Sequence, residues 1–244
     1  MTSSGPRPRG SRAALEVGQS LAAMNWVDLS HPLRPSMPVY PGHPQFASIP
    51  WHAGGAVRMS QLLLGEHMGT HLDSPSHVYP DVADPRHLPV DAIPLQSLAG
   101  PAVKLDFEGT EGGALIGVQE IRDWEARHGQ IMPATIIICK FGWSAKWRKI
   151  TDPEYVASWP GLSEAGAAYL VDRGIRMVGT DCLGIDSSSA HGLPAHETLL
   201  ANNVPIVENL ANLDEVPAEF VFIALPLRID GGSGSPIRAV ALVP

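Results

Sequence analysis

The segment that most constrains the fold of this chain is the run 67–77, HMGTHLDSPSH, which holds three histidines and one aspartate. Imidazole and carboxylate groups are the side chains with which proteins bind zinc, manganese or iron. The alternative is a polar loop on a solvated surface, because the glycine, serine, threonine and proline of this run are common in loops. A metal site explains better why so many of its polar side chains can bind an ion.

The spacing within this run excludes a single regular element. His67 and His71 are four residues apart, which would place them on one face of a helix, whereas His71 and Asp73 share one face only in extended chain. Gly69 can adopt backbone angles that other residues avoid, and Pro75 disfavours helix at the residue before it. We therefore expect a turn that leads into irregular or extended backbone folded around an ion.

Apolar runs and helical patterns alternate along the rest of the chain, which predicts an α/β domain. We expect a buried strand at 59–64, just before the histidine-rich segment, and a strand buried on both faces at 135–141. Ser163 is a suitable N-cap for one expected helix, and Gly129 and Gly174 are suitable helix ends. Further strands are expected at 103–107, 175–179, 204–207, 220–225 and 237–242, and helices at 118–127, 163–173 and 196–202.

Composition limits the functions that this chain can have. Its 244 residues suit one domain, and a net charge of −8 argues against a nucleic-acid surface. The basic residues between Lys140 and Lys149 alternate with Trp143 and Trp147, a pattern that we interpret as the solvated edge of an amphipathic helix. The two cysteines, at 139 and 182, lie in apolar sequence and are expected to be buried free thiols. No apolar run has membrane-spanning length.

The amino-terminal residues 1–24 are expected to form a flexible or loosely packed extension, and residues 25–244 a single domain. Polar residues interrupt 13–24 too often for the core of a signal peptide, so we expect a cytoplasmic protein. An amphipathic arm that packs on a sister subunit is the other interpretation of this extension.

The motif His-x-Gly-Thr-His-x-Asp-x-Pro-x-His at 67–77 resembles the signature of the cyclase-like metal-dependent hydrolases, the family of bacterial kynurenine formamidase. Other parts of the chain resemble further segments of that family, in order and in spacing: 28–33, 37–42, 179–181, 184–186, 195–200, 207–210, 224–227 and 235–240. The resemblance covers about residues 25–244. It implies a single α/β domain with the family's swivelling β/β/α arrangement.

The resemblance also implies a set of metal ligands, namely His67, His71, Asp73, His196 and Glu208. The spacing from Asp186 distinguishes His196 from His191, which the residues alone would rate equally. Two carboxylates among five ligands exceed what one tetrahedral zinc requires. Either one or two ions, zinc or manganese, therefore fit, and the second carboxylate favours two.

His77 takes the place of the family's proton shuttle beside the metal, since a histidine can give a proton to a leaving group. A further ligand or an outer hydrogen-bonding group is the alternative. Tyr40 matches a tryptophan that holds the aromatic substrate in kynurenine formamidase, and it too can stack on a ring. His43 and Gly184 depart from the family pattern of aspartate and serine. Trp51, Trp143, Trp147 and Trp159 could line the pocket, although core packing is the simpler interpretation of most of them.

Three functions are consistent with these features. The first is a metal-dependent hydrolase that cleaves an amide, such as the aryl-formamide of N-formylkynurenine. The second is a lactone or isatin-type lactam hydrolase, or a cyclase of secondary metabolism. The third is an inactive metal-binding protein, which the intact set of histidines and carboxylates disfavours. The resemblance also implies a homo-oligomer, either a dimer or a tetramer, that acts on a small molecule and binds neither nucleic acid nor membrane.

Overall fold

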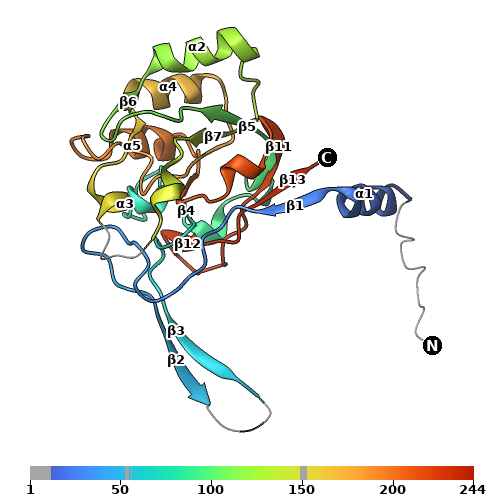
Figure 1. Cartoon of the computed structure of the whole chain (residues 1–244), viewed down its shortest axis with the longest axis vertical. Coiled ribbons are helices and arrows are strands. Elements are labelled where there is room, and N and C mark those ends of the chain that lie inside the picture. Colours follow the sequence, from blue (N-terminus) through green and yellow to red (C-terminus); the bar gives the residue numbers. More distant parts are fainter. Residues whose placement is uncertain (1–11, 53–54, 56, 149–152) are drawn as a thin grey trace.

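A curled nine-stranded mixed sheet forms the centre of the molecule (Figure 1). The computed structural model describes residues 12–52, 55, 57–148 and 153–244. The strands β5, β7, β9 and β10 run parallel, and antiparallel strands extend the sheet on both sides. From edge to edge the sheet contains β1 (Asn25–Asp28), β13 (Val240–Val243), β11 (Glu219–Ile223), β5 (Ala99–Asp106), β7 (Ile136–Lys140), β9 (Met177–Thr180), β10 (Ile206–Glu208), β4 (His71–Asp73) and β12 (Gly234–Pro236).

The central strand β7 shows why the sheet needs cover on both faces. All five of its residues are buried, as predicted for 135–141. Ile137 and Cys139 belong to the core cluster on the helical side, whereas Ile136 and Ile138 belong to the cluster on the other side. This period-two alternation of a wholly apolar strand is typical of parallel strands between two packed layers.

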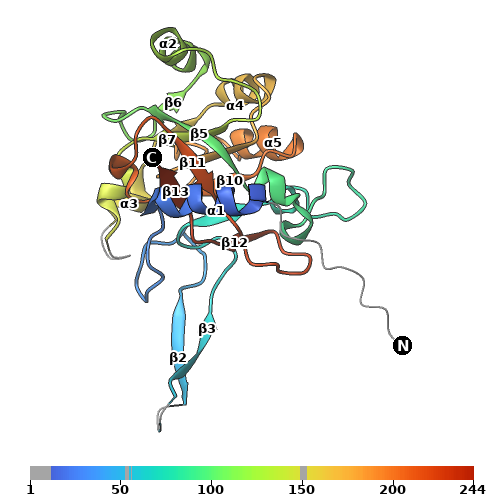
Figure 2. The same cartoon turned by 90° about the vertical axis from the view of Figure 1, so that its right-hand side faces the viewer.

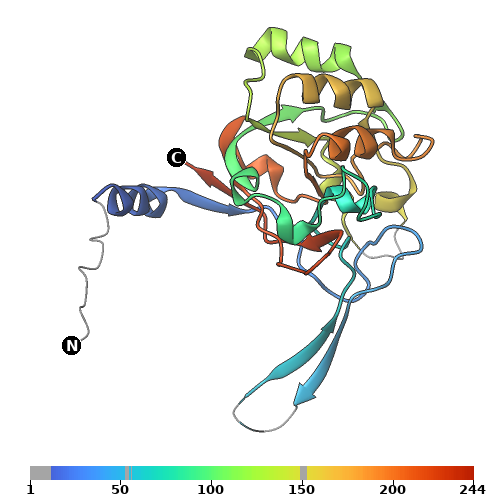
Figure 3. The ribbon, with the colours of Figure 1, turned by 180° about the vertical axis from the view of Figure 1, so that it is seen from behind.

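Helices cover one face of the sheet (Figure 3). They are α2 (Val118–His128), α4 (Glu164–Asp172) and α5 (Pro194–Ala201), with the short α3 (Glu154–Ala157) near them. The Ser163 side chain accepts a hydrogen bond from the Gly166 amide at the start of α4, and Gly129 ends α2 with a positive φ of 100°. The predicted α/β class and the predicted helices are therefore confirmed, with ends shifted by a few residues.

Short elements complete the fold. A second parallel pair consists of β6 (Leu115–Ile116) and β8 (Gly161–Leu162). Single 3₁₀ turns occur at η1 (Pro75–His77), η2 (Val90–Ala92), η3 (Leu95–Ser97), η4 (Trp143–Lys146) and η5 (Leu213–Glu215). Cys139 and Cys182 are buried free thiols, as expected from their apolar neighbours.

The prediction of a buried strand at 59–64 was wrong in its burial. Strand β3 (Met59–Leu63) pairs with β2 (Ala47–His52) in an antiparallel hairpin that extends away from the sheet (Figures 1 and 2). Most of its side chains are exposed, and Leu62 is 53% exposed. An apolar run predicts that its side chains are buried, but it does not identify the residues that bury them.

The prediction of an amphipathic helix edge across Lys140 and Lys149 was also wrong within the described residues. Lys140 ends the buried strand β7, where Asp106, Glu108 and Asp214 form ion pairs with its ammonium group. Trp143 and Trp147 are buried around the short η4 turn, and Lys149 lies outside the described residues. The alternating basic and aromatic residues therefore follow the end of strand β7 and do not form the edge of an amphipathic helix.

The amino-terminal α1 (Arg12–Ala23) stands clear of the sheet and has no buried residue (Figure 1). Residues 1–11 of the predicted extension lie outside the described part of the chain. No helix among the described residues has the length and apolar character needed to cross a membrane.

Tyr155 gives a test of the packing beneath the sheet. Its hydroxyl is fully buried and shares its one proton between the Asp181 carbonyl oxygen at 3.0 Å and Asn209 Oδ1 at 2.8 Å. Tyr155→Phe should lower the free energy of unfolding in urea by about 1–3 kcal/mol, because it leaves buried acceptors unpaired. The matched variant Tyr79→Phe removes a hydroxyl that bonds the Glu197 carbonyl oxygen nearer the surface, and should cost less than about 1 kcal/mol. Equal losses would contradict this account.

Candidate metal centre

Two adjacent strands bring three of the predicted ligands together. His71 and Asp73 are two residues apart in β4 and therefore share one face. Antiparallel pairing places Glu208 of β10 directly opposite His71. His71 Nε2 consequently lies 3.4 Å from Asp73 Oδ1 and 3.5 Å from Glu208 Oε2. His71 and Glu208, which are 137 positions apart in the chain, thus become neighbours through strand register alone.

The turn before β4 places His67 beside the same carboxylate. Gly69 has a φ of +60°, and a Cβ there would lie 2.6 Å from Leu33 Cδ2, so the turn favours glycine. His67 Nδ1 lies 2.5 Å from Asp73 Oδ1. Across the sheet, a Cβ at Gly234 would lie 2.6 Å from His67 Cε1. Two glycines therefore make room for the predicted turn and for the imidazole that it carries.

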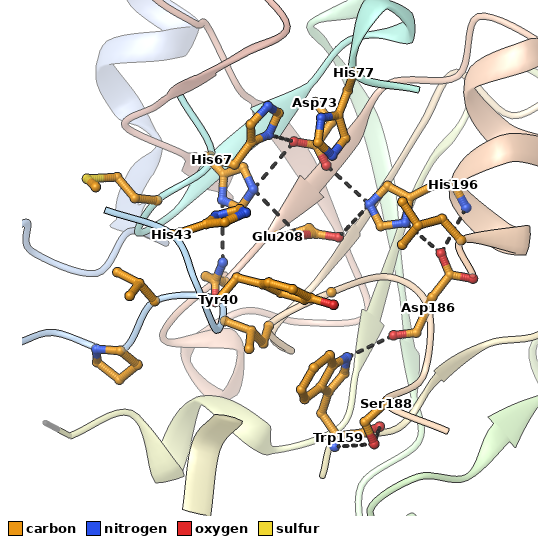
Figure 4. A pocket seen from close by; sticks show the side chains of 18 of the residues that line it. Tyr40, His43, His67, Asp73, His77, Trp159, Asp186, Ser188, His196 and Glu208 are labelled. Atoms are coloured by element: carbon orange, nitrogen blue, oxygen red, sulfur yellow. Dashed lines mark hydrogen bonds and ion pairs between the residues drawn. The ribbon is translucent and has the colours of Figure 1, made fainter. Parts of the chain in front are cut away.

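Helix α5 supplies His196 from the opposite side of the cluster (Figure 4). His196 Nε2 lies 3.1 Å from Glu208 Oε1 and 3.5 Å from Asp73 Oδ2. Asp186 accepts hydrogen bonds from His196 Nδ1 at 2.6 Å and from the amides of Ala195 and His196 at the start of α5. The same carboxylate therefore anchors the first turn of the helix and orients its imidazole.

The three imidazoles share one arrangement, in which the outer ring nitrogen is engaged and the inner one faces the carboxylates. His71 Nδ1 donates to the Gly69 carbonyl oxygen at 2.9 Å, and His196 Nδ1 faces Asp186. The Ser233 hydroxyl donates to Glu66, so it accepts from His67 Nε2 at 2.8 Å. Outer acceptors of this kind fix the tautomer of metal-binding histidines and leave a lone pair for the ion.

The charges at the centre fit a divalent cation. Asp73 Oδ2 is buried and has only a long contact among the described residues, to His196 Nε2 at 3.5 Å, and a buried carboxylate is costly without a positive partner close by. Burial would raise the pKa of Asp73, but the charges of His71 and His67 and hydrogen bonds from His196 and His67 hold it well below its usual value. Burial would lower the pKa of His196, yet hydrogen bonds to Asp186, Asp73 and Glu208 raise it well above the usual value.

These shifts mean that Asp73 stays ionised and that protons on His67 and His196, whose pKa values are raised, balance its charge. A bound ion would replace those protons, because metal ligands bind in their deprotonated form. Two donor groups with this geometry overlap at Asp73: one joins it to His67 and His77, and the other joins it to His71 and Glu208. A carboxylate shared by two donor groups suits either a single ion or two bridged ions.

His77 extends from η1 beside His67, with ring centroids 3.9 Å apart. Burial lowers the pKa of His77 to about 4 against the opposing charge of Asp73, so the imidazole is neutral near pH 7 and can accept a proton. Its place within one donor group keeps the ligand interpretation of this residue open.

The cluster lies at the bottom of a cavity of about 430 Å³ that all seven predicted site residues line. Near its mouth, the rings of Tyr40 and Trp159 meet edge to face with centroids 6.0 Å apart (Figure 4). Trp159 is held by a hydrogen bond from its Nε1 to the Asp186 carbonyl oxygen. A Cβ at Gly184 would lie 3.3 Å from that nitrogen, so glycine at this position suits the indole. No lysine or arginine is among the described residues that line the cavity.

The structure shows which of the candidate residues that the sequence left open line the cavity and which do not. His191 is exposed and does not line the cavity. Of the four tryptophans considered for the pocket, only Trp159 lines it, Trp143 and Trp147 pack in the core, and Trp51 is on the projecting hairpin. Sequence reasoning used Asp186 only as a spacing marker and missed Ser233 and Gly234. Their contacts depend on β12 meeting β4, and no local pattern signals that pairing.

Comparison with known proteins identifies relatives along most of the chain. The family described as "Putative cyclase" matches residues 27–187. Isatin hydrolase of Roseibium aggregatum is 31% identical over 243 residues, covering 89% of this chain and 91% of that protein. Kynurenine formamidase of Bacillus cereus is also 31% identical, covering 88% of this chain and 96% of that protein.

The fold agrees as well. The crystal structure of an isatin hydrolase bound to the product analogue thioisatinate superposes with a TM-score of 0.88 at 28% identity, covering 97% of this chain and all of that one. Isatin hydrolase A from Ralstonia solanacearum gives a TM-score of 0.83 at 27% identity, with both chains fully covered. By sequence and by fold, this chain belongs to the cyclase family of metal-dependent hydrolases.

Proposed function

We propose that this protein is a metal-dependent hydrolase that cleaves the amide bond of a small aromatic substrate. The observation that carries the proposal is the buried Asp73, which faces the inner nitrogens of His67 and His196 and lies beside that of His71. With Glu208 these residues would hold one or two divalent ions at the bottom of the cavity. The family relatives named kynurenine formamidase and isatin hydrolase support the same reaction class.

A bound divalent ion supplies two things here: it lowers the pKa of a water molecule to about 7 and it polarises the carbonyl of the substrate. The protein supplies position and proton transfer. Asp186 holds His196, and the Ile185 amide donates to Glu208 Oε1 at 2.6 Å. Neutral His77 can accept a proton at its unprotonated ring nitrogen and then donate it to the leaving nitrogen of the substrate. This is the role of a general acid–base catalyst.

The walls of the cavity support an aromatic substrate. Tyr40 and Trp159 present ring surfaces at the mouth, and aromatic pairs of this kind add about 0.5–1.5 kcal/mol beyond the burial of their area. An aryl-formamide of the kind that the name of the kynurenine formamidase relatives implies would place its ring there and its formyl carbon at the centre, and we propose a role in tryptophan catabolism on that basis.

One observation favours a second candidate, an uncharged cyclic amide of the isatin type. N-formylkynurenine carries an α-carboxylate, and burying an anion without a positive partner is costly. The described lining contains no lysine or arginine, so no ammonium or guanidinium group among these residues can pair with such a carboxylate. A neutral lactam needs no such partner.

Several further features are part of the proposal. We expect zinc or manganese as the ion, because histidine and carboxylate ligands suit both. Two free cysteines suit a reducing compartment, which supports a cytoplasmic location. We further propose that residues 25–244 form the catalytic domain, that 1–24 form an extension, and that the chain assembles as a dimer or tetramer.

Metal content tests the ligand set. The protein should purify with zinc or manganese, and exhaustive chelation should abolish turnover. His71→Ala and Asp73→Asn should each weaken metal affinity by more than about 100-fold, beyond the 10–100-fold typical of an outer partner. The matched control His191→Ala, at an exposed histidine outside the cavity, should bind metal normally. Elemental analysis and metal titration give both answers, and unchanged metal content in the two ligand variants would refute the assignment.

His77 tests the separation of binding from chemistry. His77→Ala should keep its metal and lose about 10²–10⁴-fold in kcat with little change in KM, because a proton-transfer group acts in the transition state. Steady-state kinetics on the metal-loaded variant measure this loss. A metal content that falls in step with activity would make His77 a ligand instead.

Substrate assays separate the two candidate functions. The metal-loaded protein should hydrolyse isatin with a higher kcat/KM than N-formylkynurenine, because only the latter brings a carboxylate to a described lining that offers it no lysine or arginine. Tyr40→Ala should raise KM for either aromatic substrate by up to about 10-fold, the value of one ring contact. A preference for the charged substrate would exclude the second candidate, and no turnover of any amide would exclude both.

A further inference from the structure

We propose that Glu66, acting through Ser233, is a positioning residue that decides which ring nitrogen of His67 faces the metal. This inference rests on the proposed function only because it takes the cluster of histidines and carboxylates as a metal site. Glu66 directly precedes His67 in the chain, and Ser233 directly precedes β12. Both residues are half-buried. Neither lines the cavity, so a change in either one leaves the walls that face a substrate intact.

The hydrogen bonds of Ser233 have a fixed direction. Its amide donates to Glu66 Oε2 at 3.1 Å, and its hydroxyl donates to the same oxygen at 2.5 Å. A carboxylate can only accept hydrogen bonds, so the single hydroxyl proton of Ser233 points to Glu66. The hydroxyl oxygen then has only lone pairs to offer His67 Nε2, which lies 2.8 Å away. Glu66 therefore favours the tautomer of His67 with its proton on Nε2.

The other nitrogen of the His67 ring is thereby left for the ion. With the proton on Nε2, a neutral imidazole has its lone pair on Nδ1. This nitrogen faces Asp73 Oδ1 at 2.5 Å (Figure 4). A lone pair and a carboxylate oxygen repel each other at this distance unless positive charge lies beside them. A metal ion between His67 and Asp73 would supply that charge, so Glu66 prepares the pair from outside the cavity.

Two glycines give Ser233 access to both of its partners. A Cβ at Gly232 would lie 2.9 Å from Glu66 Oε1, and a Cβ at Gly234 would lie 2.6 Å from His67 Cε1. Side chains at these two positions would push the loop away from the carboxylate or from the imidazole. The short sequence Gly-Ser-Gly is therefore suited to a close contact on each side of the serine.

The backbone of Ser233 is fixed to the strand that carries Asp73. Its carbonyl oxygen accepts hydrogen bonds from the Ser74 amide at 3.0 Å and from the Ser74 hydroxyl at 2.8 Å. Ser74 follows Asp73 directly in the chain. Ser233 therefore contacts both sides of the His67–Asp73 pair, the imidazole through its hydroxyl and the strand of the carboxylate through its carbonyl.

Glu66→Gln tests the direction of these hydrogen bonds with almost no change in shape. A carboxamide can donate, so the Ser233 hydroxyl can turn its proton toward His67 Nε2, and the ring proton then occupies Nδ1, where it competes with the ion. Titration of the full-length, chelator-stripped protein with zinc should show a dissociation constant raised about 10–100-fold, the usual effect of losing an outer partner. Ser233→Ala should fall in the same range. The double variant should lose no more than the larger single loss, because Glu66 acts through Ser233.

Ser235→Ala is the matched control. This serine is buried in β12, two residues from Ser233, but its hydroxyl bonds the Leu227 amide and the Pro236 carbonyl oxygen and not a histidine. The variant should keep the zinc affinity of the wild type. An equal loss of affinity in this control would mean that the loop acts only through its stability.

A spectroscopic measurement completes the test and needs no substrate. Long-range ¹H–¹⁵N spectra of the zinc-loaded wild-type protein should show His67 bound to zinc through Nδ1 with its proton on Nε2, and His67→Ala assigns the signals. Coordination through Nε2, or a Glu66→Gln variant with wild-type zinc affinity, would overturn the positioning role while the set of metal ligands stands. A wild-type chain that binds no zinc or manganese would instead refute the metal site, and this inference with it.

Discussion

The interaction on which the rest of the site depends is the pairing of β4 with β10. It places Glu208 opposite His71 and keeps Asp73 on the same face, so two carboxylates and an imidazole share one buried space. Isolated ionised carboxylates cannot remain there without positive charge. The other site residues, His67 from the turn and His196 from α5, supply that charge and prepare a place for a cation.

The outer hydrogen bonds explain why this cluster is specific. Gly69, Ser233 and Asp186 each engage one nitrogen of a histidine and thereby turn the other nitrogen inward. Asp186 also anchors α5, so the helix and its imidazole are fixed by one carboxylate. Metal sites depend on such partners for ligand orientation. The same loop holds Trp159 at the mouth, which links the metal centre to the substrate wall.

The molecule thus combines a rigid centre with an exposed periphery. The parallel strands and their two core layers leave little freedom around the carboxylates. The hairpin is apolar, nearly uncharged and without cover from its own chain, yet it begins and ends at cavity-lining residues. The cavity walls therefore continue directly into an exposed apolar hairpin.

The sequence by itself determined the donor types, the central strands and helices, and the turn at Gly69, because these depend on local periodicity, side-chain chemistry and backbone freedom. The family resemblance added His196 and Glu208, whose local context left His196 equal to His191. Only the tertiary structure revealed Ser233, Gly234 and the pairing role of Asp186, because each acts across strands or loops distant in the chain. It also decided that 59–64 is exposed and that Lys140 is buried among carboxylates. Burial is a property of neighbours, and the neighbours are set by strand order rather than by the apolar run itself.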